Sequence, residues 1–440
     1  MTSGPIAGTI VRFAVPVFFG NMFQQLYNAV DSLIVGNFVG GDALAAVSSS
    51  GSLIFLFTGL IQGIFIGAGV VIARYFGARE PDKVQKAVHT TMAFAVLSGL
   101  IMVAAGILLT PWILRLMGTP DSVLPNSILY FRIYFAGFLS VVVYNAVSGI
   151  MQAVGDSRHP LYYLIISSLL NVALDLLFVA YFRWGIAGAG AATVISQTVS
   201  ASLGFIRLVR SDTEVRIFPA KIRLDMPMLK NIMRIGMPSG LQNSIISLAN
   251  VVVQSNINAF GAMAMAGCGS YAKVEGFAFP PVTSFTMAIT TFVSQNLGAK
   301  EYSRARKGAG FGILACITIA ELIGITINIL SPKLVAMFNA DPEVVRFGVT
   351  MARTTTLFYC LMAYSHCMAA VMRGCGRSMV PMIVMLVCWC VIRVTYITVT
   401  VHFIPDIRVV YWAYPITWAL STIVYSAYYL RTKPLNEHAA

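Results

Sequence analysis

Long apolar runs alternate with short polar connections along the whole chain. Each run is long enough for a helix that crosses the ~30 Å hydrocarbon core of a bilayer. Because the runs are continuous and do not alternate residue by residue, they exclude a transmembrane β-barrel. We predict an all-α polytopic membrane protein whose twelve spans lie near residues 13–36, 43–73, 88–110, 124–150, 160–182, 186–206, 235–259, 264–297, 308–330, 344–371, 380–401 and 409–430.

Composition and charge support this prediction. Of the 440 residues, 58% are hydrophobic and 11% are charged, whereas about a quarter of a soluble domain is charged. The net charge of +13 could suggest nucleic acid, but most basic residues fall in the connections on one side of the predicted membrane. The positive-inside rule places these connections and both termini in the cytoplasm, and we expect no nucleic-acid partner.

Polar residues within the first predicted span fall on one face of the helix. At about 100° per residue they lie within roughly an 80° arc, and they are Asn21, Gln24, Asn28 and Asp31. A carboxylate at membrane depth is costly unless it is paired, hydrated or protonated, so Asp31 is a candidate functional residue. The alternative is that Asp31 caps a helix that ends early. The apolar run continues through Leu33 and Val35, which favours a continuous helix.

The second half of the chain repeats the first. Four residues of the first half recur 222 positions later, namely Arg12, Pro16, Asn21 and Asn28 as Arg234, Pro238, Asn243 and Asn250. Each copy has an even number of spans, so both copies enter the membrane from the same side and are related by a pseudo-two-fold axis along its normal. We predict an N-lobe of residues 1–206 with helices 1–6 and the cation-coupling site, a cytoplasmic linker of residues 207–234, and a C-lobe of residues 235–440 with helices 7–12. This symmetry suits alternating access, and the alternative is a twelve-helix structural protein or channel.

The fifth predicted span offers a second carboxylate. Asn171 and Asp175 are four residues apart and therefore share a helix face. If the first and fifth helices are neighbours, Asp31 and Asp175 meet. Two nearby carboxylates allow a proton to load and leave at physiological pH, and their oxygens equally suit Na⁺ as a bound metal ion. The alternative for Asp175 is a helix end cap near the outer surface.

The second half lacks these acids. The positions equivalent to Asp31, Asn171 and Asp175 hold Val253, Ile392 and Tyr396. Its first helix keeps a neutral polar stripe, made of Asn243, Ser247, Asn250, Gln254 and Asn258. We expect ion coupling in the N-lobe, while Asn21, Gln24, Asn28, Asn243, Asn250, Gln254 and Glu275 line the substrate cavity. Glu275 lies ~15 Å along its helix, where it either receives a cationic substrate or pairs with Arg353 or Lys273.

Three motifs carry a family resemblance over essentially the whole chain. They are FAVPVFFGNMFQQLYNAVDSLIVGNFVG at residues 13–40, RYFGARE at 74–80 with its echo QNLGAKE at 295–301, and GDSRHP at 155–160. On these motifs the sequence resembles the multidrug and toxic compound extrusion (MATE) transporters. The resemblance implies the MATE fold, a multi-pass protein of the bacterial inner membrane, a monomer, and transport rather than enzymatic activity.

Within that family the chain resembles the DinF-like branch more than the NorM-like branch. The resemblance implies a cation-coupling network of Tyr27, Asp31, Asn145, Asn171, Asp175 and Thr193. The NorM-like branch uses a glutamate in helix 7 and an aspartate in helix 10, and this chain has neither. The DinF-like branch also implies that Pro16 is a hinge that bends helix 1 when the network is protonated. Because Pro238 repeats Pro16, the alternative is a static kink in both lobes.

The function expected from these observations is secondary active antiport. The protein would export amphipathic organic cations in exchange for H⁺ or Na⁺, with no cofactor besides the coupling ion and with the bilayer as its other partner. No Walker-type motif is present, which argues against direct drive by ATP. The alternative is a flippase for lipid-linked oligosaccharides of the same superfamily. Such a flippase handles an anionic diphosphate and should line its cavity with Arg or Lys, whereas the polar stripes here are acidic or neutral.

Overall fold

The computed structural model describes residues 1–39, 41–116 and 124–436, and these residues form helices joined by short connections. The helices of the first half are α1 (Ile6–Phe38), α2 (Gly41–Gly77), α3 (Pro81–Leu116), α4 (Leu124–Ala136), α5 (Phe138–Ala153), α6 (Arg158–Asp175), the π-helical η1 (Leu176–Tyr181) and α7 (Gly185–Val209). Helix α1 continues seven residues beyond Asp31, so Asp31 lies inside the helix and not at its cap.

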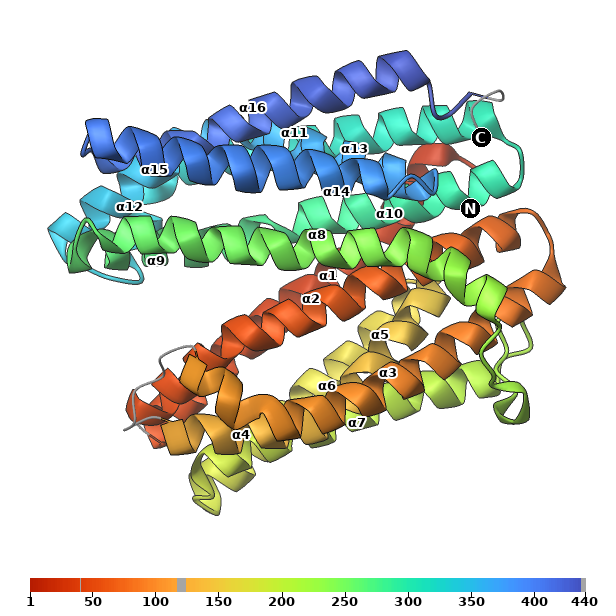
Figure 1. The fold of residues 1–440 in the computed structure, drawn as a ribbon, viewed down its shortest axis with the longest axis horizontal. Coiled ribbons are helices and arrows are strands. Elements are labelled where there is room, and N and C mark those ends of the chain that lie inside the picture. Colours follow the sequence, from red (N-terminus) through yellow and green to blue (C-terminus); the bar gives the residue numbers. More distant parts are fainter. Residues whose placement is uncertain (40, 117–123, 437–440) are drawn as a thin grey trace. The chain divides into compact units, whose positions relative to one another are not determined.

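The second half repeats this order after the short 3₁₀ helix η2 (Pro219–Lys221). Its helices are α8 (Met226–Asn258), α9 (Ala262–Ala278), α10 (Pro280–Gly298), α11 (Tyr302–Ala336), α12 (Pro342–Thr355), η3 (Thr356–Phe358), α13 (Tyr359–Gly374), α14 (Met379–Met385), η4 (Leu386–Ile392), α15 (Arg393–Phe403) and α16 (Ile407–Thr432). Figure 1 colours the helices in the order of the sequence, from red at the N-terminus to blue at the C-terminus.

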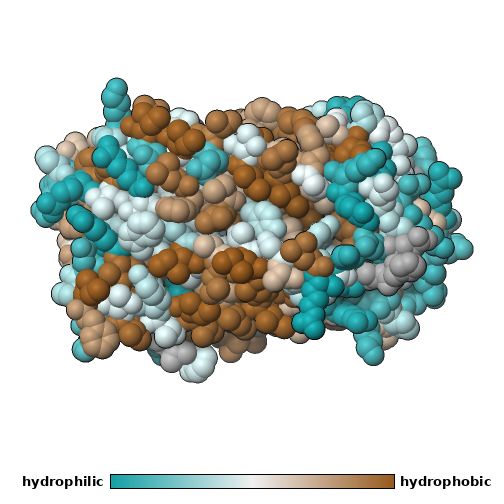
Figure 2. Space-filling model, turned by 90° about the horizontal axis from the view of Figure 1, so that it is seen from above, coloured by the Kyte–Doolittle hydropathy of each residue, from teal (hydrophilic) through white to brown (hydrophobic). Residues whose placement is uncertain are grey.

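The twelve predicted spans correspond to these helices. Eight helical runs of the described residues are long and apolar enough to cross a membrane, and two bent pairs raise the number to ten. Helices α8 and α16 complete the twelve, and α8 is less apolar because it carries the polar stripe. On the face visible in Figure 2, hydrophobic side chains gather in a central zone with hydrophilic residues at both ends. The predicted all-α, twelve-helix class is therefore confirmed.

The bends inside two spans were not predicted. Helices α4 and α5 meet at 45°, and α9 and α10 meet at 40°. A Cβ atom on Gly137, between α4 and α5, would lie 2.5 Å from the Val194 side chain, so only glycine allows α7 to approach this closely. Between α9 and α10, Pro280 lacks the N–H that a continuous helix requires. Glycine thus permits close packing at the first bend, and proline interrupts the backbone hydrogen bonding at the second.

The two halves repeat the same turns. Arg79 and Lys300 both adopt left-handed backbone conformations, with φ of 57° and 60°. In each turn the following glutamate N–H returns to a carbonyl of the preceding helix, from Glu80 to Tyr75 at 3.1 Å and from Glu301 to Asn296 at 2.8 Å. This hydrogen bond is the one that closes a helix C-terminus in the Schellman motif. The matching geometry of these two turns supports the duplication predicted from the sequence.

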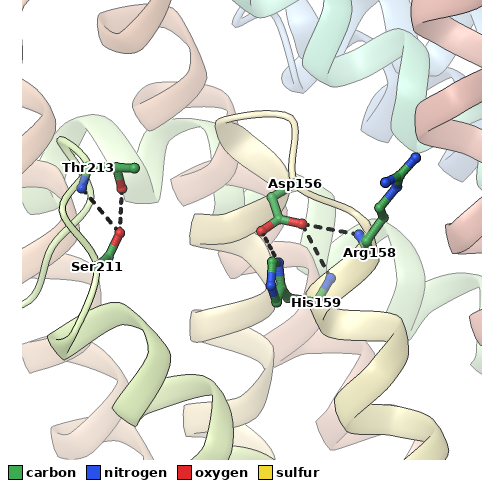
Figure 3. A network of polar contacts seen from close by, with 5 residues as sticks. All are labelled: Asp156, Arg158, His159, Ser211 and Thr213. Atoms are coloured by element: carbon green, nitrogen blue, oxygen red, sulfur yellow. Dashed lines mark hydrogen bonds and ion pairs between the residues drawn. The ribbon is translucent and has the colours of Figure 1, made fainter.

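The connection between α5 and α6 contains the GDSRHP motif, and Figure 3 shows Asp156, Arg158 and His159 of this motif. Gly155 has φ of 92°, a conformation that glycine adopts without strain. Asp156 Oδ1 accepts the N–H groups of Arg158 and His159 at 3.2 Å each, and its Oδ2 lies 2.6 Å from His159 Nδ1. Asp156 thereby satisfies backbone donors at the start of α6. The motif thus has a clear role in starting this helix.

The chain divides into two compact units whose bounds differ from the predicted lobes. One unit holds Met1–Phe18 together with Met237–Ala440, and the other holds Phe19–Gly236. The start of α1 thus groups with the second half, while residues 207–236 group with the first half. Both boundaries between the two units fall inside a helix, close to Pro16 in α1 and to Pro238 in α8. The linker is therefore part of a compact unit.

Candidate functional site

The unit of residues 19–236 brings the two predicted carboxylates together. Asp31 comes from α1 and Asp175 is the last residue of α6, directly before the π-helical turn η1. Their carboxyl groups lie within hydrogen-bonding reach of each other. Asp175 is fully buried. The expected meeting of the first and fifth predicted spans is therefore present in the structure.

Asn171 holds Asp175 in place. In the amide orientation that satisfies both of its polar atoms, Asn171 Nδ2 donates to Asp175 Oδ2 at 2.7 Å, and its oxygen accepts the Thr193 N–H at 3.2 Å. Asn171 is 1% exposed, so water does not replace these bonds. The spacing of four residues predicted this shared helix face. The contact with α7 could not be read from the spacing, since it depends on how α6 and α7 pack.

Thr193 and Tyr27 join the acids from two further directions. Thr193 Oγ1 donates to the Ala189 carbonyl of its own helix at 3.1 Å, which is the usual bond of a helix-interior threonine. Tyr27 of α1 lies beside the same side chain. Helices α1, α6 and α7 therefore meet through polar side chains, and the sequence named all of these residues.

Two tyrosines complete the group and were not predicted. Tyr130 and Tyr134 of α4 lie near Tyr27, and Tyr130 also lies near both acids. Their ring centroids are 6.4 Å apart. Their spacing of four residues indicates a shared face, but the chain holds 18 tyrosines, and no sequence signal separated these two from the others.

Each carboxylate keeps one oxygen free. Asp31 Oδ1 and Asp175 Oδ1 are buried, and neither has a hydrogen-bond partner in the part of the chain that the structure describes. An unsatisfied buried oxygen carries a desolvation cost of about 1–3 kcal/mol, and more when it is charged. Two such atoms in neighbouring carboxyl groups suit a proton or a small cation, which would remove the cost.

A bound Na⁺ would rely on few acids. Over the described residues, no group of three or more His, Cys, Asp or Glu side chains is arranged to hold a metal ion. The remaining ligands would be the amide oxygen of Asn171 and the hydroxyls of Thr193 and Tyr27. Oxygen atoms of these types suit a hard cation. The residues fit Na⁺ in chemistry, and they fit a proton equally well.

Asn145 is the one predicted network residue that the structure does not link to the acids. Its Nδ2 donates to the Val141 carbonyl of its own helix at 2.8 Å. No bond from Asn145 to Asp31 or Asp175 is present among the described residues. Its role in the network therefore stays a prediction from the resemblance.

The polar stripes of α1 and α8 have unequal exposure. Asn21 and Asn243 are half-buried, whereas the four residues further along are exposed, namely Gln24, Asn28, Asn250 and Gln254. In α8, Gln254 Nε2 donates to Asn258 Oδ1 at 2.8 Å, and Ser247 donates to the Asn243 carbonyl at 2.9 Å. Val253, which replaces the aspartate of the first half, is 1% exposed. The loss of the acid thus coincides with burial of that position.

Glu275 has neither of the ion pairs considered from the sequence. It accepts a hydrogen bond from the Tyr359 hydroxyl at 3.3 Å, while Lys273 lies over the Phe338 ring at 5.5 Å. The bonds continue from the Tyr359 hydroxyl to the Tyr271 hydroxyl at 2.8 Å, and from there to Thr355 Oγ1 at 2.7 Å. Glu275 therefore ends a chain of four side-chain oxygens beside the break between α12 and α13.

Arg393 supplies the positive charge near Glu275. It is 2% exposed, and its Nε and one terminal nitrogen both donate to Thr417 Oγ1, at 3.2 and 2.8 Å. Its guanidinium also lies 4.5 Å from the Tyr414 ring centroid, a favourable cation–π distance. An arginine in the middle of a predicted span was a visible signal, and the sequence interpretation overlooked it.

The family model MatE matches the chain twice, at residues 16–177 and 238–399. The probable multidrug resistance protein YoeA of Bacillus subtilis (strain 168) is 30% identical over 426 residues, which cover 95% of this chain and 92% of that protein. The FAD transporter of Shewanella oneidensis is 22% identical over 352 residues, which cover 79% of this chain and 77% of that protein.

A solved structure shares the fold. It is a transporter of the MOP superfamily from Pyrococcus furiosus, with a TM-score of 0.92, 23% sequence identity, and coverage of 98% of this chain and 97% of that one. The two separate family matches also support the duplication read from the sequence. The family match spans both halves, and the chain therefore belongs to the MatE family of multidrug and toxic compound extrusion transporters.

Proposed function

We propose that this protein is a secondary active antiporter that exports amphipathic organic cations in exchange for H⁺ or Na⁺. The observation that carries the proposal is the contact between Asp31 and Asp175, where each carboxyl group keeps one buried oxygen without a partner. A bound ion neutralises these carboxylates, and they regain their charge only after the ion leaves. Exchange requires such alternate binding and release of the coupling ion. The name of the relative YoeA as a probable multidrug resistance protein agrees with drug export.

Charge on the polar stripes favours a cationic substrate. The stripes of α1 and α8 hold Asp31 and neutral amides and contain no Lys or Arg. A lipid-linked oligosaccharide carries an anionic diphosphate, and these stripes offer it no positive partner. The flippase alternative therefore has less support. Glu275 is the other acid proposed to contact substrate, although its hydrogen bond to Tyr359 must first be exchanged.

The two acids support a coupling site in the first half of the chain, and the sequence resemblance supports the DinF-like branch. Tyr27, Asn171 and Thr193 position the pair, and Asn145 is included from the resemblance alone. The connections rich in Lys and Arg lie on the same side of the membrane as the two termini. We therefore propose that both termini are cytoplasmic and that the protein lies in a bacterial inner membrane. We further propose that a single chain performs transport, without nucleic acid or an organic cofactor.

Transport by purified protein in lipid vesicles tests this function. A fluorescent organic cation is loaded, and its movement is followed under a proton gradient alone, a sodium gradient alone, or neither. We expect movement against the dye gradient with one of the two ions and none without a gradient. Equal dye movement in all three conditions would contradict antiport and indicate a channel.

A further inference from the structure

A hollow of about 490 Å³ lies between α12 and the first turns of α16. This end of the two helices is remote from the chain termini in Figure 1. Two guanidinium groups and several apolar side chains line it, namely Arg353, Arg408, Leu357, Phe358 and Trp412. We call it the arginine groove. It contains no acidic lining residue.

The two arginines of the groove have no carboxylate to balance them. On the same helix, Arg346 forms an ion pair with Glu343 at 3.4 Å, whereas no acid within the described ranges lies within ion-pair distance of the Arg353 or Arg408 guanidinium. Asp406 lies close in sequence, but its Oδ1 accepts the Arg408 backbone N–H at 2.9 Å as the cap of α16. The groove is therefore locally positive.

Arg353 belongs to a membrane span, where an unbalanced charge is unfavourable. Residues Pro342–Gly374 form one of the helical runs long and apolar enough to cross the bilayer. An arginine in such a run extends its side chain toward the interface and seeks an anion there. Trp412, at the edge of the groove, is 45% exposed, and exposed tryptophans gather at the headgroup level. The anion available at that level is a lipid phosphate.

We propose that the arginine groove binds the phosphate group of an anionic membrane phospholipid. Two guanidiniums can hold phosphate oxygens through paired N–H donors, which is the geometry that arginine matches best. Leu357, which is 48% exposed, and Phe358, whose ring lies 5.8 Å from the Trp412 ring, provide an apolar surface for the glycerol and the upper acyl chains. A free phosphate ion would use the arginines but not this apolar surface, and this difference favours the lipid.

The first half of the chain provides a matched control. Arg132 occupies the repeat position of Arg353, but its Nε donates to the Ile107 carbonyl at 3.3 Å. The repeat position of Arg408 holds Ala187, so the first half has no guanidinium at that position. The first half therefore lacks this pair of arginines at the equivalent positions, and Arg132→Gln removes one equivalent positive charge without changing the groove.

Native mass spectrometry of the full-length protein tests the proposal. The protein in detergent is mixed with phosphatidylglycerol, or with phosphatidylcholine of the same acyl chains, and the retained lipids are counted. We expect the double variant Arg353→Gln/Arg408→Gln to retain one phosphatidylglycerol fewer than the wild type. We expect Arg132→Gln to retain the wild-type number and phosphatidylcholine retention to be the same in all three proteins. An unchanged phosphatidylglycerol count in the double variant would overturn the proposal, as would an equal loss in Arg132→Gln.

A second arm separates the lipid from free phosphate and from misfolding. Inorganic phosphate at millimolar concentration is added before the lipid, and we expect the retained phosphatidylglycerol to stay unchanged. Displacement of the lipid, together with a phosphate adduct on the wild type only, would assign the groove to free phosphate instead. The thermal unfolding midpoint without lipid checks the fold. If the double variant unfolds well below the wild type, the single variant Arg408→Gln, at the end of α16, replaces it with the same expected loss.

Discussion

At the scale of the residue, the function depends on two aspartates that share one environment. Asp31 and Asp175 each leave a buried oxygen without a hydrogen bond, whereas the side chains of Asn171 and Thr193 form hydrogen bonds. Asparagine has the shape of aspartate but can neither release a proton nor carry a charge. Substitution of either aspartate by asparagine should therefore abolish the coupling between ion and substrate while substrate binding remains.

We predict that Asp31→Asn binds the organic cation without dependence on pH or Na⁺. In the wild type, the coupling ion should change the dissociation constant by about tenfold, within the usual range of coupling between sites. Asp175→Asn should behave in the same way. Fluorescence titrations of purified protein at several pH and sodium values measure this dependence. An Asp31→Asn protein that keeps the full wild-type dependence would place the coupling site elsewhere.

Glu275 presents a different choice at the residue scale. We predict that Glu275→Gln changes the relative export of different substrates more than the ion dependence, because Glu275 lies outside the aspartate pair. Tyr359→Phe removes the hydroxyl that bonds both Glu275 and Tyr271, at a cost of about 1–3 kcal/mol of unfolding free energy. Export of several cations by cells that make equal amounts of each variant measures the difference. A uniform loss for every substrate, equal in both variants, would assign Glu275 a purely structural role.

At the scale of the element, α1 and α8 each contain a proline near the residue where the chain passes from one compact unit to the other. Each proline removes one backbone hydrogen bond and makes local bending easier. Only α1 carries an acid further along its stripe, since Val253 replaces the aspartate in α8. Both helices thus contain a proline that eases bending, but only α1 contains an acid whose charge could control the bend.

We predict that Pro16→Ala reduces transport strongly and that Pro238→Ala reduces it much less. If bending responds to the charge of Asp31, it can be controlled in α1, whereas α8 has no corresponding acid. Initial rates of dye efflux at matched protein amounts compare the two variants, and each serves as the control of the other. Equal effects would show that both kinks are architectural.

The start of α8 allows a prediction about pH. The Met228 N–H donates to Asp225 Oδ1 at 3.0 Å, and this bond, helped by Lys86 at 3.3 Å from Oδ2, holds the Asp225 pKa below its usual value. Because the folded carboxyl binds its proton less tightly than the unfolded one, it stabilises the fold above pH ~4 and loses this effect as the pH falls through the folded pKa.

We therefore expect Asp225→Asn to lower the thermal unfolding midpoint by about 1–2 °C at pH 7, with a difference that shrinks below pH 4. Differential scanning fluorimetry in detergent measures both midpoints. Asp212→Asn, at an exposed linker position, provides the control and should match the wild type throughout. A difference that persists unchanged at pH 3 would contradict the assigned cause.

At the scale of the whole molecule, the sequence predicted the helices well because hydrophobic length alone sets a membrane span. Asp31 was found from the polar stripe of its helix and Asp175 from its spacing to Asn171, but their meeting was predicted only on the condition that the first and fifth helices are neighbours. The close packing at Gly137 could not be predicted, since it depends on how closely Val194 of another helix approaches. Tyr130 and Tyr134 were missed for a similar reason, because periodicity defines a helix face but not the helix that it meets. The division into units also differed, since α1 and α8 each belong to both.

Gradient-driven export by Asp31→Asn in lipid vesicles tests the central claim most directly. Wild-type and variant proteins are reconstituted at equal density, and accumulation of a fluorescent organic cation is recorded as a proton or a sodium gradient is imposed. We predict that the wild type moves the cation against its gradient with one of these ions, and that Asp31→Asn moves none with either ion although it still binds the dye. Accumulation by Asp31→Asn at the wild-type rate would contradict the assignment of coupling to the aspartate pair.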